Sequence, residues 1–361
     1  MTTERQDWGT LDGQDISTFT IRNAHGASLV LSDYGATAVQ MNIPSPSGAI
    51  ADVILGFDTL AAYRGTPTYF GATVGRFGNR IRRGRFALDG KTCAVSCNEG
   101  ENSLHGGVTG FDKRKWAARF DPTGNSVTFS LTSPDGDQGF PGTLTATSQY
   151  TLTNDGILRI DLRAATDRPT VCNMVHHSYF NLAGHESGTV LDQELQIHAD
   201  FYTPVDDELI ITGEVVKVAG TPFDFRKPRP IGAAIDQVAN AGAGRVQGSG
   251  GYDHNWCLAG EPGRLRPVLT ARDPASGRGF ELWTTEPGVH LYTGGYLDAS
   301  VIGKGETPYR KFAGFTLETQ KFPDGPNLSH VPQSRLDPGD NYHHVMEFRF
   351  FTPGRPGHGS R

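Results

Sequence analysis

The chain of 361 residues contains few cysteines, and they are not arranged as a metal site or a disulfide framework. The four are Cys93, Cys97, Cys172 and Cys257. Cys93 and Cys97 stand four residues apart on a predicted strand, which separates them by about 13 Å, too far for a disulfide. Because no two cysteines are spaced as Cys-x-x-Cys, we expect reduced thiols and no structural zinc site.

The sequence also lacks the signals of membrane and nucleic-acid proteins. Its N-terminus, Met-Thr-Thr-Glu-Arg-Gln-Asp-Trp, has no apolar segment of the kind found in targeting signals, and no apolar run approaches the length of a membrane span. The formal net charge is -6, whereas a nucleic-acid groove requires a basic face. We therefore expect a cytoplasmic protein with no membrane or nucleic-acid partner.

Glycine and proline, in contrast, are abundant along the whole chain. There are 46 Gly and 22 Pro, and 10% of the residues are aromatic. This composition is typical of many short strands joined by turns, and all-β folds often reach such a length as one unit. We predict an all-β protein, a large antiparallel β-sandwich, with a single domain over residues 1–351. The last ten residues, 352–361, are rich in Gly, Pro and charge and are predicted to form a flexible tail.

Turn signals place several hairpins. The strongest is Asp89-Gly90 between two alternating segments, a pattern that favours a tight two-residue turn. Other predicted turns lie at Asp33-Tyr34-Gly35 within residues 28–42, at Thr123-Gly124-Asn125, at Asn154-Asp155-Gly156 and at residues 273–277.

Helical signals are few. Residues 58–64 are predicted to form one helical turn. A longer helix is predicted near residues 231–241, because Ile231, Ala234, Ile235 and Val238 follow the i, i+3, i+4, i+7 spacing of an apolar helix face.

The segment Gly314-Phe315-Thr316-Leu317-Glu318-Thr319-Gln320 alternates between apolar and polar residues. This pattern predicts a strand with Phe315 and Leu317 on one face and Glu318 on the polar face of a half-buried sheet. A carboxylate held there is either a solvated surface group or an acid/base on the floor of a cleft.

Histidines and other polar residues supply partners for that carboxylate. On a predicted strand His177 shares one face with Tyr179, whereas His176 shares the other with Ser178. The further candidates stand in Gly-rich loops or on predicted strands, and they are Asn79, Arg80, His105, Asp253 and His290. Taken singly, each has an ordinary structural explanation.

Taken together, these segments resemble the aldose 1-epimerases, also called galactose mutarotases. The motifs run from about Leu55 to Phe350 in the order and spacing of that family. They are Gly75-Arg76 through Arg80-Ile81, Asn98-Glu99-Gly100 with Ser103-Leu104-His105-Gly106-Gly107, His177-Ser178-Tyr179-Phe180-Asn181-Leu182, Asp253-His254-Asn255, and Leu317-Glu318-Thr319-Gln320 with Phe322-Pro323-Asp324.

The resemblance implies a galactose mutarotase-like supersandwich with an open sugar cleft, a free hexose such as glucose or galactose as substrate, and no cofactor or metal. It implies that Glu318 is the catalytic base and His177 the catalytic acid. The implied sugar-binding residues are Asn79, Arg80, His105, Ser178, Tyr179, Asp253 and His290. His290 departs from the family pattern, in which this position is commonly Gln. The preferred aldose and the choice between monomer and homodimer stay open.

Three alternatives remain at this point. The first is a metal-dependent, cupin-like enzyme with His105, His177, His290 and Glu318 as ligands. The second is a sandwich that binds sugars without catalysis. The third is an epimerase of the same fold that acts on sugar phosphates, which requires a cluster of cations. Five arginines are available for such a cluster, but they scatter over both strand faces: Arg76, Arg80, Arg82, Arg83 and Arg85. We interpret Arg82, Arg83 and Arg85 as mostly solvated.

Overall fold

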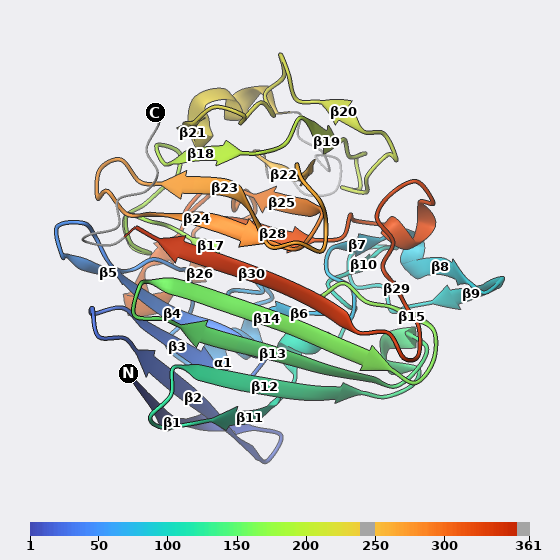
Figure 1. The fold of residues 1–361 in the computed structure, drawn as a ribbon, viewed down its shortest axis with the longest axis horizontal. Helices are drawn as coiled ribbons and strands as arrows, with labels where there is room; N and C mark the ends of the chain where they lie inside the picture. The colour runs from blue at the N-terminus through green and yellow to red at the C-terminus, as the bar shows by residue number, and fades with distance from the viewer. Residues whose placement is uncertain (239–249, 352–361) are drawn as a thin grey trace.

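The structure is a computed structural model that describes residues 1–238 and 250–351. Three large antiparallel sheets form most of it (Figure 1). In spatial order, the nine-stranded sheet consists of β11 (Ala117–Phe120), β12 (Ser126–Ser133), β13 (Leu144–Leu152), β14 (Ile157–Thr166), β30 (Tyr342–Phe350), β24 (Gly279–Thr284), β23 (Arg266–Arg272), β18 (Glu194–Ile197) and β21 (Arg229–Pro230).

The other two large sheets pack against the nine-stranded sheet. The five-stranded sheet consists of β1 (Thr2–Leu11), β2 (Gln14–Arg22), β3 (Ser28–Ser32), β4 (Thr37–Pro44) and β5 (Ile50–Asp52). The six-stranded sheet consists of β17 (Tyr179–Phe180), β28 (Phe315–Gln320), β25 (Gly288–Tyr292), β22 (Asp253–Cys257), β19 (Phe201–Thr203) and β20 (Val216–Lys217).

Short two-stranded sheets and helical turns complete the fold. The strand pairs are β10 (Ser103–Leu104) with β7 (Arg80–Ile81), β15 (Thr170–Val171) with β29 (Arg335–Leu336), β16 (Val175–His176) with β6 (Thr73–Val74), β26 (Val301–Ile302) with β27 (Pro308–Tyr309), and β8 (Arg85–Leu88) with β9 (Lys91–Ala94). The helical elements are α1 (Leu60–Gly65) and the 3-10 turns η1 (Arg82–Gly84), η2 (Phe111–Lys113), η3 (Asp137–Gly139), η4 (Ile231–Gln237), η5 (Lys304–Glu306) and η6 (Gly325–Asn327).

One hydrophobic core joins the three large sheets. It contains Leu29 of β3, Phe129 of β12 and Leu317 of β28, none of them more than 2% exposed. Alternating residues from each sheet fill the space between the layers, as packed sheets require. This is the β-sandwich that the sequence predicts. The extent of the domain, residues 1–351, stays a prediction, and residues 352–361 lie outside the described part of the chain.

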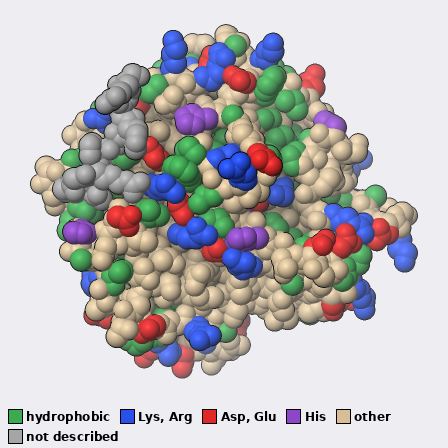
Figure 2. All heavy atoms as spheres, viewed as in Figure 1, with side chains coloured by type: hydrophobic (Ala, Val, Ile, Leu, Met, Phe, Trp, Pro, Cys, Tyr) green, Lys and Arg blue, Asp and Glu red, His purple; other side chains and the backbone are tan. Residues whose placement is uncertain are grey.

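The outer face of the nine-stranded sheet is polar. On β14 and β30, Arg159 pairs with Glu347 at 2.8 Å and Arg349 pairs with the same carboxylate at 2.6 Å. Basic and acidic side chains therefore lie interspersed on the face shown in Figure 2. Glu347 is buried, and the two arginines compensate its charge there.

The predicted turns are confirmed. The turn at Asp33-Tyr34-Gly35 joins β3 to β4, and Asp89-Gly90 joins β8 to β9. The turns at residues 123–125, 154–156 and 273–277 join β11 to β12, β13 to β14, and β23 to β24, respectively.

Of the two helix predictions, one is confirmed and the other is wrong. The turn near residues 58–64 is α1, capped by Thr59, whose hydroxyl accepts a hydrogen bond from the Ala62 N–H. The longer helix is wrong as an α-helix: residues 231–237 form the 3-10 turn η4, interrupted at Ala234, which has φ -141°. Ile231 and Ile235 are buried there, so the apolar spacing reflects packing without helix continuation. The rest of the prediction, residues 239–241, lies outside the described residues.

The predictions about thiols and membrane spans can also be compared with the structure. All four cysteines are free; Cys93 lies in β9 and Cys97 beyond its end. None of the helices within residues 1–238 and 250–351 has the length and apolar character that crossing a bilayer requires.

Candidate active site

A cavity of about 430 Å³ lies over the polar face of the six-stranded sheet, where β28, β25 and β22 run side by side. This volume suits a small molecule such as a monosaccharide. The residues that line it are Thr66, Pro67, Thr68, Tyr69, Asn79, Arg80, Glu99, Leu104, His105, His177, Tyr179, Asp253, His290, Tyr292, Tyr296, Leu297, Ser300, Val301 and Glu318. Eight of the nine site residues predicted from the sequence are among them.

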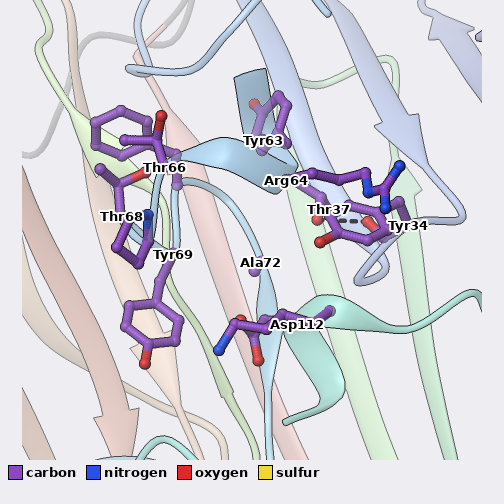
Figure 3. Close-up of a pocket in the computed structure, with 12 residues that line it drawn as sticks. Tyr34, Thr37, Tyr63, Arg64, Thr66, Thr68, Tyr69, Ala72 and Asp112 are labelled. Atoms are coloured by element: carbon purple, nitrogen blue, oxygen red, sulfur yellow. Dashed lines mark hydrogen bonds and ion pairs between the residues drawn. The ribbon is translucent and has the colours of Figure 1, made fainter. Parts of the chain in front are cut away.

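A second, smaller cavity adjoins the first. Its volume is about 80 Å³, room for only a few water molecules. Figure 3 shows it with Thr66, Thr68 and Tyr69 along one side and Tyr34, Thr37 and Arg64 on the other. Because residues 66–69 also line the larger cavity, this segment is the wall between the two. Of these two adjoining cavities, the larger has room for a sugar.

Glu318 lines the larger cavity. Its strand, β28, is flanked by β17 and β25, and the predicted alternation holds, with Phe315 and Leu317 in the core. The expectation of a half-buried strand is wrong, because all six residues of β28 are buried. The polar face of the strand is covered by the walls of the cavity, and Glu318 is 2% exposed.

His177 reaches the cavity from the link between β16 and β17. Its N–H donates to the Ala72 carbonyl at 2.9 Å, and its carbonyl accepts from the Gly71 N–H at 3.0 Å. These two backbone bonds fix the position of the imidazole, which is packed against Tyr179 with ring centroids 5.3 Å apart.

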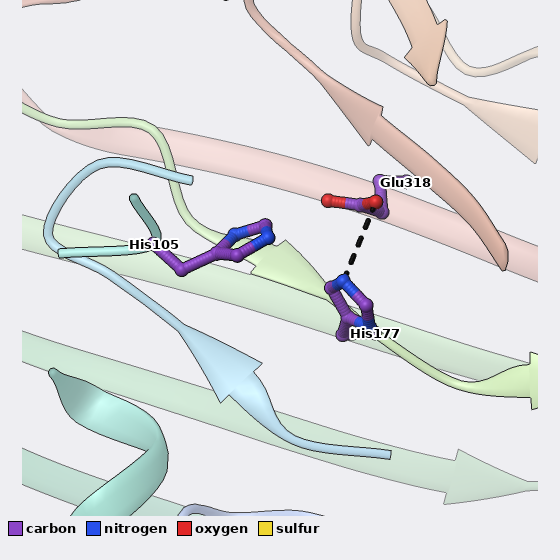
Figure 4. Close-up of side chains that lie close together, drawn as sticks. All are labelled: His105, His177 and Glu318. Carbon is purple, nitrogen blue, oxygen red and sulfur yellow. Dashed lines mark ion pairs between the residues drawn. The ribbon is translucent and has the colours of Figure 1, made fainter. Parts of the chain in front are cut away.

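The two side chains meet at the floor of the cavity. His177 Nε2 lies 3.5 Å from Glu318 Oε1, and Figure 4 shows both pointing toward each other, with His105 beside them. The Thr316 hydroxyl donates to Glu318 Oε1 at 3.3 Å. Glu318 Oε2 and His177 Nδ1 are buried without a hydrogen-bond partner among the described residues. A carboxylate and an imidazole this close can move protons between two oxygens borne on one carbon.

His105 is locked by Asn79. The Asn79 N–H donates to His105 Nδ1 at 3.1 Å, and the His105 N–H donates to the Asn79 carbonyl at 3.2 Å. Since Nδ1 accepts, the neutral ring carries its proton on Nε2, as a donor. Burial, with the charges of His177 and Arg80, lowers the pKa of His105 well below its usual value, so the ring is neutral near pH 7.

Glycine is required after His105. Gly106 has φ +90°, and a Cβ there would lie 1.9 Å from the Gly75 carbonyl oxygen. This contact explains why the loop reads His105-Gly106 and why the imidazole can approach the β7 segment so closely.

His105, His177 and Glu318 also offer ligand atoms within 4.8 Å of one another, a possible metal shell. A metal-bound histidine normally donates its second ring N–H to an acceptor. His105 Nδ1 instead faces the Asn79 N–H, which is a donor. Among the described residues, His290, the fourth predicted ligand, does not belong to the group whose ligand atoms come together. The donor set predicted for a cupin-like metal centre therefore does not fit these residues.

Charged groups form a row beyond the pair. Arg80 Nε and Nη2 donate to Glu99 at 2.6 and 2.8 Å, and Asp253 Oδ2 lies 4.0 Å from Arg80 Nη2. Burial alone would raise the pKa of Asp253, but the hydrogen bond from His290 and the charge of Arg80 lower it to about 2. Asp253 is therefore an ionised acceptor at neutral pH.

The other arginines do not line the cavity. Arg76 is 1% exposed and donates to the Ser133, Pro134 and Pro141 carbonyls, a structural role. The interpretation of solvated charges agrees with the exposure of Arg83 and Arg85, but only partly with Arg82, which pairs with Asp206 at 2.8 Å.

Ser178 is the predicted site residue that the structure does not bring to the cavity. Its hydroxyl is hydrogen-bonded to His176 Nε2 at 2.7 Å on the core side, and it is 1% exposed. The strand alternation already put Ser178 on the face of His176, opposite His177, so the signal was present in the sequence.

Sequence reasoning assigned no role to several lining residues. Tyr69 packs against His105 and His177 at 4.7 and 5.7 Å, and nothing in the sequence around it indicated this. Glu99 belongs to the Asn98-Glu99-Gly100 motif, but no role was predicted for its side chain. Tyr292 follows His290 by two residues and so shares its strand face.

Comparison with known proteins agrees with this geometry. The chain is 44% identical over 317 residues to the galactose mutarotase of Bos taurus, covering 88% of this chain and 89% of that protein. It is 38% identical over 343 residues to the aldose 1-epimerase of Escherichia coli (strain K12), covering 94% and 97%.

The fold is also shared. The crystal structure of galactose 1-epimerase from Lactobacillus acidophilus NCFM superposes with a TM-score of 0.83 at 28% identity, covering 97% of this chain and 98% of that one. The family model described as aldose 1-epimerase matches residues 17–349. The chain belongs to the aldose 1-epimerase family.

Proposed function

We propose that this protein interconverts the α and β anomers of free hexoses such as glucose and galactose. The observation that carries the proposal is the 3.5 Å approach of His177 Nε2 to Glu318 Oε1 on the floor of a sugar-sized cavity. The names of the relatives, galactose mutarotase and aldose 1-epimerase, support it.

The reaction needs one base and one acid at a single carbon. Glu318 takes the proton from the C1 hydroxyl while His177 gives a proton to the ring oxygen, and the C1–O5 bond opens to the free aldehyde. Rotation about C1–C2 turns the other carbonyl face toward the ring oxygen. The ring then closes with the two roles exchanged, which leaves the protein unchanged.

Neighbouring donors support the pair. His105 Nε2–H is a neutral donor beside both side chains and can stabilise negative charge as it develops on a sugar oxygen. Asp253 supplies an ionised acceptor for a hydroxyl group farther along the ring. Tyr179 and Tyr69 form apolar walls that fix the imidazoles.

The four free cysteines support a reducing compartment, and we propose that the protein is cytoplasmic.

The direct test is polarimetry of freshly dissolved α-glucose and α-galactose with purified protein. We expect both sugars to reach anomeric equilibrium faster with the protein than in buffer alone, before and after dialysis against a chelator. A sugar that equilibrates only at the buffer rate is not a substrate, and failure with both would reject the proposal.

A further inference from the structure

The cation of the cavity is held by the protein's own carboxylates. Glu99 Oε2 accepts from Arg80 Nε at 2.6 Å, and Glu99 Oε1 accepts from Nη2 at 2.8 Å. Asp253 Oδ2 lies 4.0 Å from the same Nη2. Arg80 is 5% exposed, so little of its guanidinium remains for an additional anion.

The sheet register separates Asp253, a member of this group, from the acid/base pair. The sheet register places His290 between Glu318 of β28 and Asn255 of β22, and Asp253 precedes Asn255 by two residues on the same face. Two strand spacings of about 4.8 Å put Asp253 on the order of 10 Å from Glu318. A pyranose that has C1 at Glu318 and extends along the cavity toward β22 brings its C4–C6 end to Asp253, Arg80 and Glu99.

The lining of the cavity carries an excess of negative charge. Three carboxylates, Glu99, Asp253 and Glu318, face one guanidinium, Arg80, and no other Lys or Arg lines this cavity among the described residues. The formal charge is -2 with the three imidazoles neutral and -1 with one of them protonated. Buried sites of this sign disfavour a further anion, because water screens the repulsion poorly there.

We propose that Glu99 is a specificity-determining residue that makes the cavity select uncharged aldoses over aldoses carrying a carboxylate or phosphate at C6. It does so by engaging Nε and Nη2 of Arg80 and by adding a negative charge at the end where C6 lies. The proposal rests on the proposed function. It addresses the sugar-phosphate alternative from the sequence, since a phosphate site needs free cations and this guanidinium is occupied.

A variant that removes the charge of Glu99 tests the proposal, because it should gain activity on an anionic sugar. In Glu99→Gln only one oxygen can accept from Arg80 and the negative charge is gone, so the charge-assisted pairing of two oxygens with Nε and Nη2 is lost and Arg80 becomes available to an anionic sugar. Glu101→Gln is the matched control. It removes the same charge from the same loop, but Glu101 is exposed and does not line the cavity.

Anomerisation of galactose and of galacturonic acid is measured by NMR exchange for wild type, Glu99→Gln and Glu101→Gln. For wild type we expect kcat/KM for galacturonate to be about tenfold or more below that for galactose. Glu99→Gln should narrow this ratio by about tenfold, mainly through the KM of galacturonate, whereas Glu101→Gln should leave it at the wild-type value. The ratio of kcat/KM for glucose 6-phosphate to that for glucose should change in the same way among the three proteins.

Several outcomes would overturn the proposal. Wild type that converts galacturonate as well as galactose would refute it without any variant, so the test survives if Glu99→Gln does not fold. An unchanged ratio in a folded Glu99→Gln, or equal narrowing in Glu101→Gln, would assign the selection elsewhere. Absence of galactose turnover by wild type would instead reject the proposed function.

Discussion

The two sides of the segment that carries His176 and His177 treat their polar groups differently. On the core side, His176 Nδ1 is hydrogen-bonded to the Tyr150 hydroxyl at 3.2 Å and its Nε2 to the Ser178 hydroxyl at 2.7 Å. The Tyr150 hydroxyl donates in turn to the Ala36 carbonyl at 2.8 Å. Both nitrogens of this imidazole are thus satisfied inside the protein.

On the cavity side, the adjacent imidazole of His177 has a ring nitrogen that is not satisfied. His177 Nδ1, Glu318 Oε2 and His290 Nδ1 are buried without a hydrogen-bond partner among the described residues. An unsatisfied buried polar group costs about 1–3 kcal/mol of folding stability. The two neighbouring histidines therefore differ although their burial is similar. Both ring nitrogens of His176 are bonded within the core, whereas His177 directs Nε2 toward Glu318 and its Nδ1 has no partner among the described residues. The comparison predicts that the two sides fail differently when mutated.

Glu318→Gln should have the largest effect, on the cavity side. The amide keeps the shape of the carboxylate but cannot take a proton, so the rate should fall by about 10³–10⁴-fold. The thermal unfolding midpoint should stay near that of wild type, because Glu318 makes no strong internal bond that Gln cannot replace. Polarimetry with galactose and circular dichroism measure the two quantities. Near-normal anomerisation by a folded variant would show that the base lies elsewhere.

His177→Asn should follow, with a loss on the order of 100-fold or more. The loss should be smaller than for Glu318→Gln, because the neutral His105 Nε2–H beside it remains as a donor. Single-turnover and steady-state rates with galactose separate a loss in kcat from weaker binding. A variant that changes KM alone would make His177 a binding group and leave the acid unassigned.

The sequence predicted the architecture and most of the site for a physical reason. Turns such as Asp89-Gly90 are encoded locally, and strand alternation alone separates His177 from His176. The motif resemblance then supplied the partners from distant segments. The structure brings Glu318, His177 and His105 to one cavity floor, although they are separated by more than seventy residues along the chain.

Other features depend on tertiary contacts that no local pattern encodes. The apolar spacing around Ile231 and Ile235 matched a helix, yet packing of the two side chains is achieved by an interrupted 3-10 turn. The role of Tyr69 depends on the two imidazoles that it touches, which lie on other segments. Whether Arg80 is free or occupied depends on Glu99, whose pairing could not be read from its place in the motif.

On the core side, His176→Asn should weaken the fold more than the chemistry. Burial lowers the pKa of His176 from 6.5 to about 3, so between these values the unfolded chain binds a proton that the native protein does not. Stability from this group is therefore lost as the pH falls from about 6.5 toward 3, by at most about 1.4 kcal/mol per pH unit.

The variant should lose about 1–3 kcal/mol near pH 8 through its broken hydrogen bonds to Ser178 and Tyr150. Its deficit relative to wild type should shrink as the pH falls, because the variant has no imidazole there to protonate. Urea unfolding at pH 8, 6 and 5 checks this. A deficit that stays constant over that range would mean that His176 does not titrate as its burial requires.

His290→Gln should have the smallest effect and separates recognition from chemistry within the cavity side itself. His290 Nε2 is bonded to Asp253 Oδ1 at 2.6 Å, and a Gln amide can also donate to that carboxylate while adding a carbonyl acceptor. The rate with the best sugar should stay within a few-fold, whereas the ratios among glucose, galactose and xylose should change by about 2–10-fold, the worth of one neutral hydrogen bond. The sheet register pairs His290 directly with Glu318, so a contact to the ring of the sugar is expected there. Unchanged rate ratios among the three sugars would mean that His290 acts only on Asp253 and that its unpaired Nδ1 does not contact the substrate.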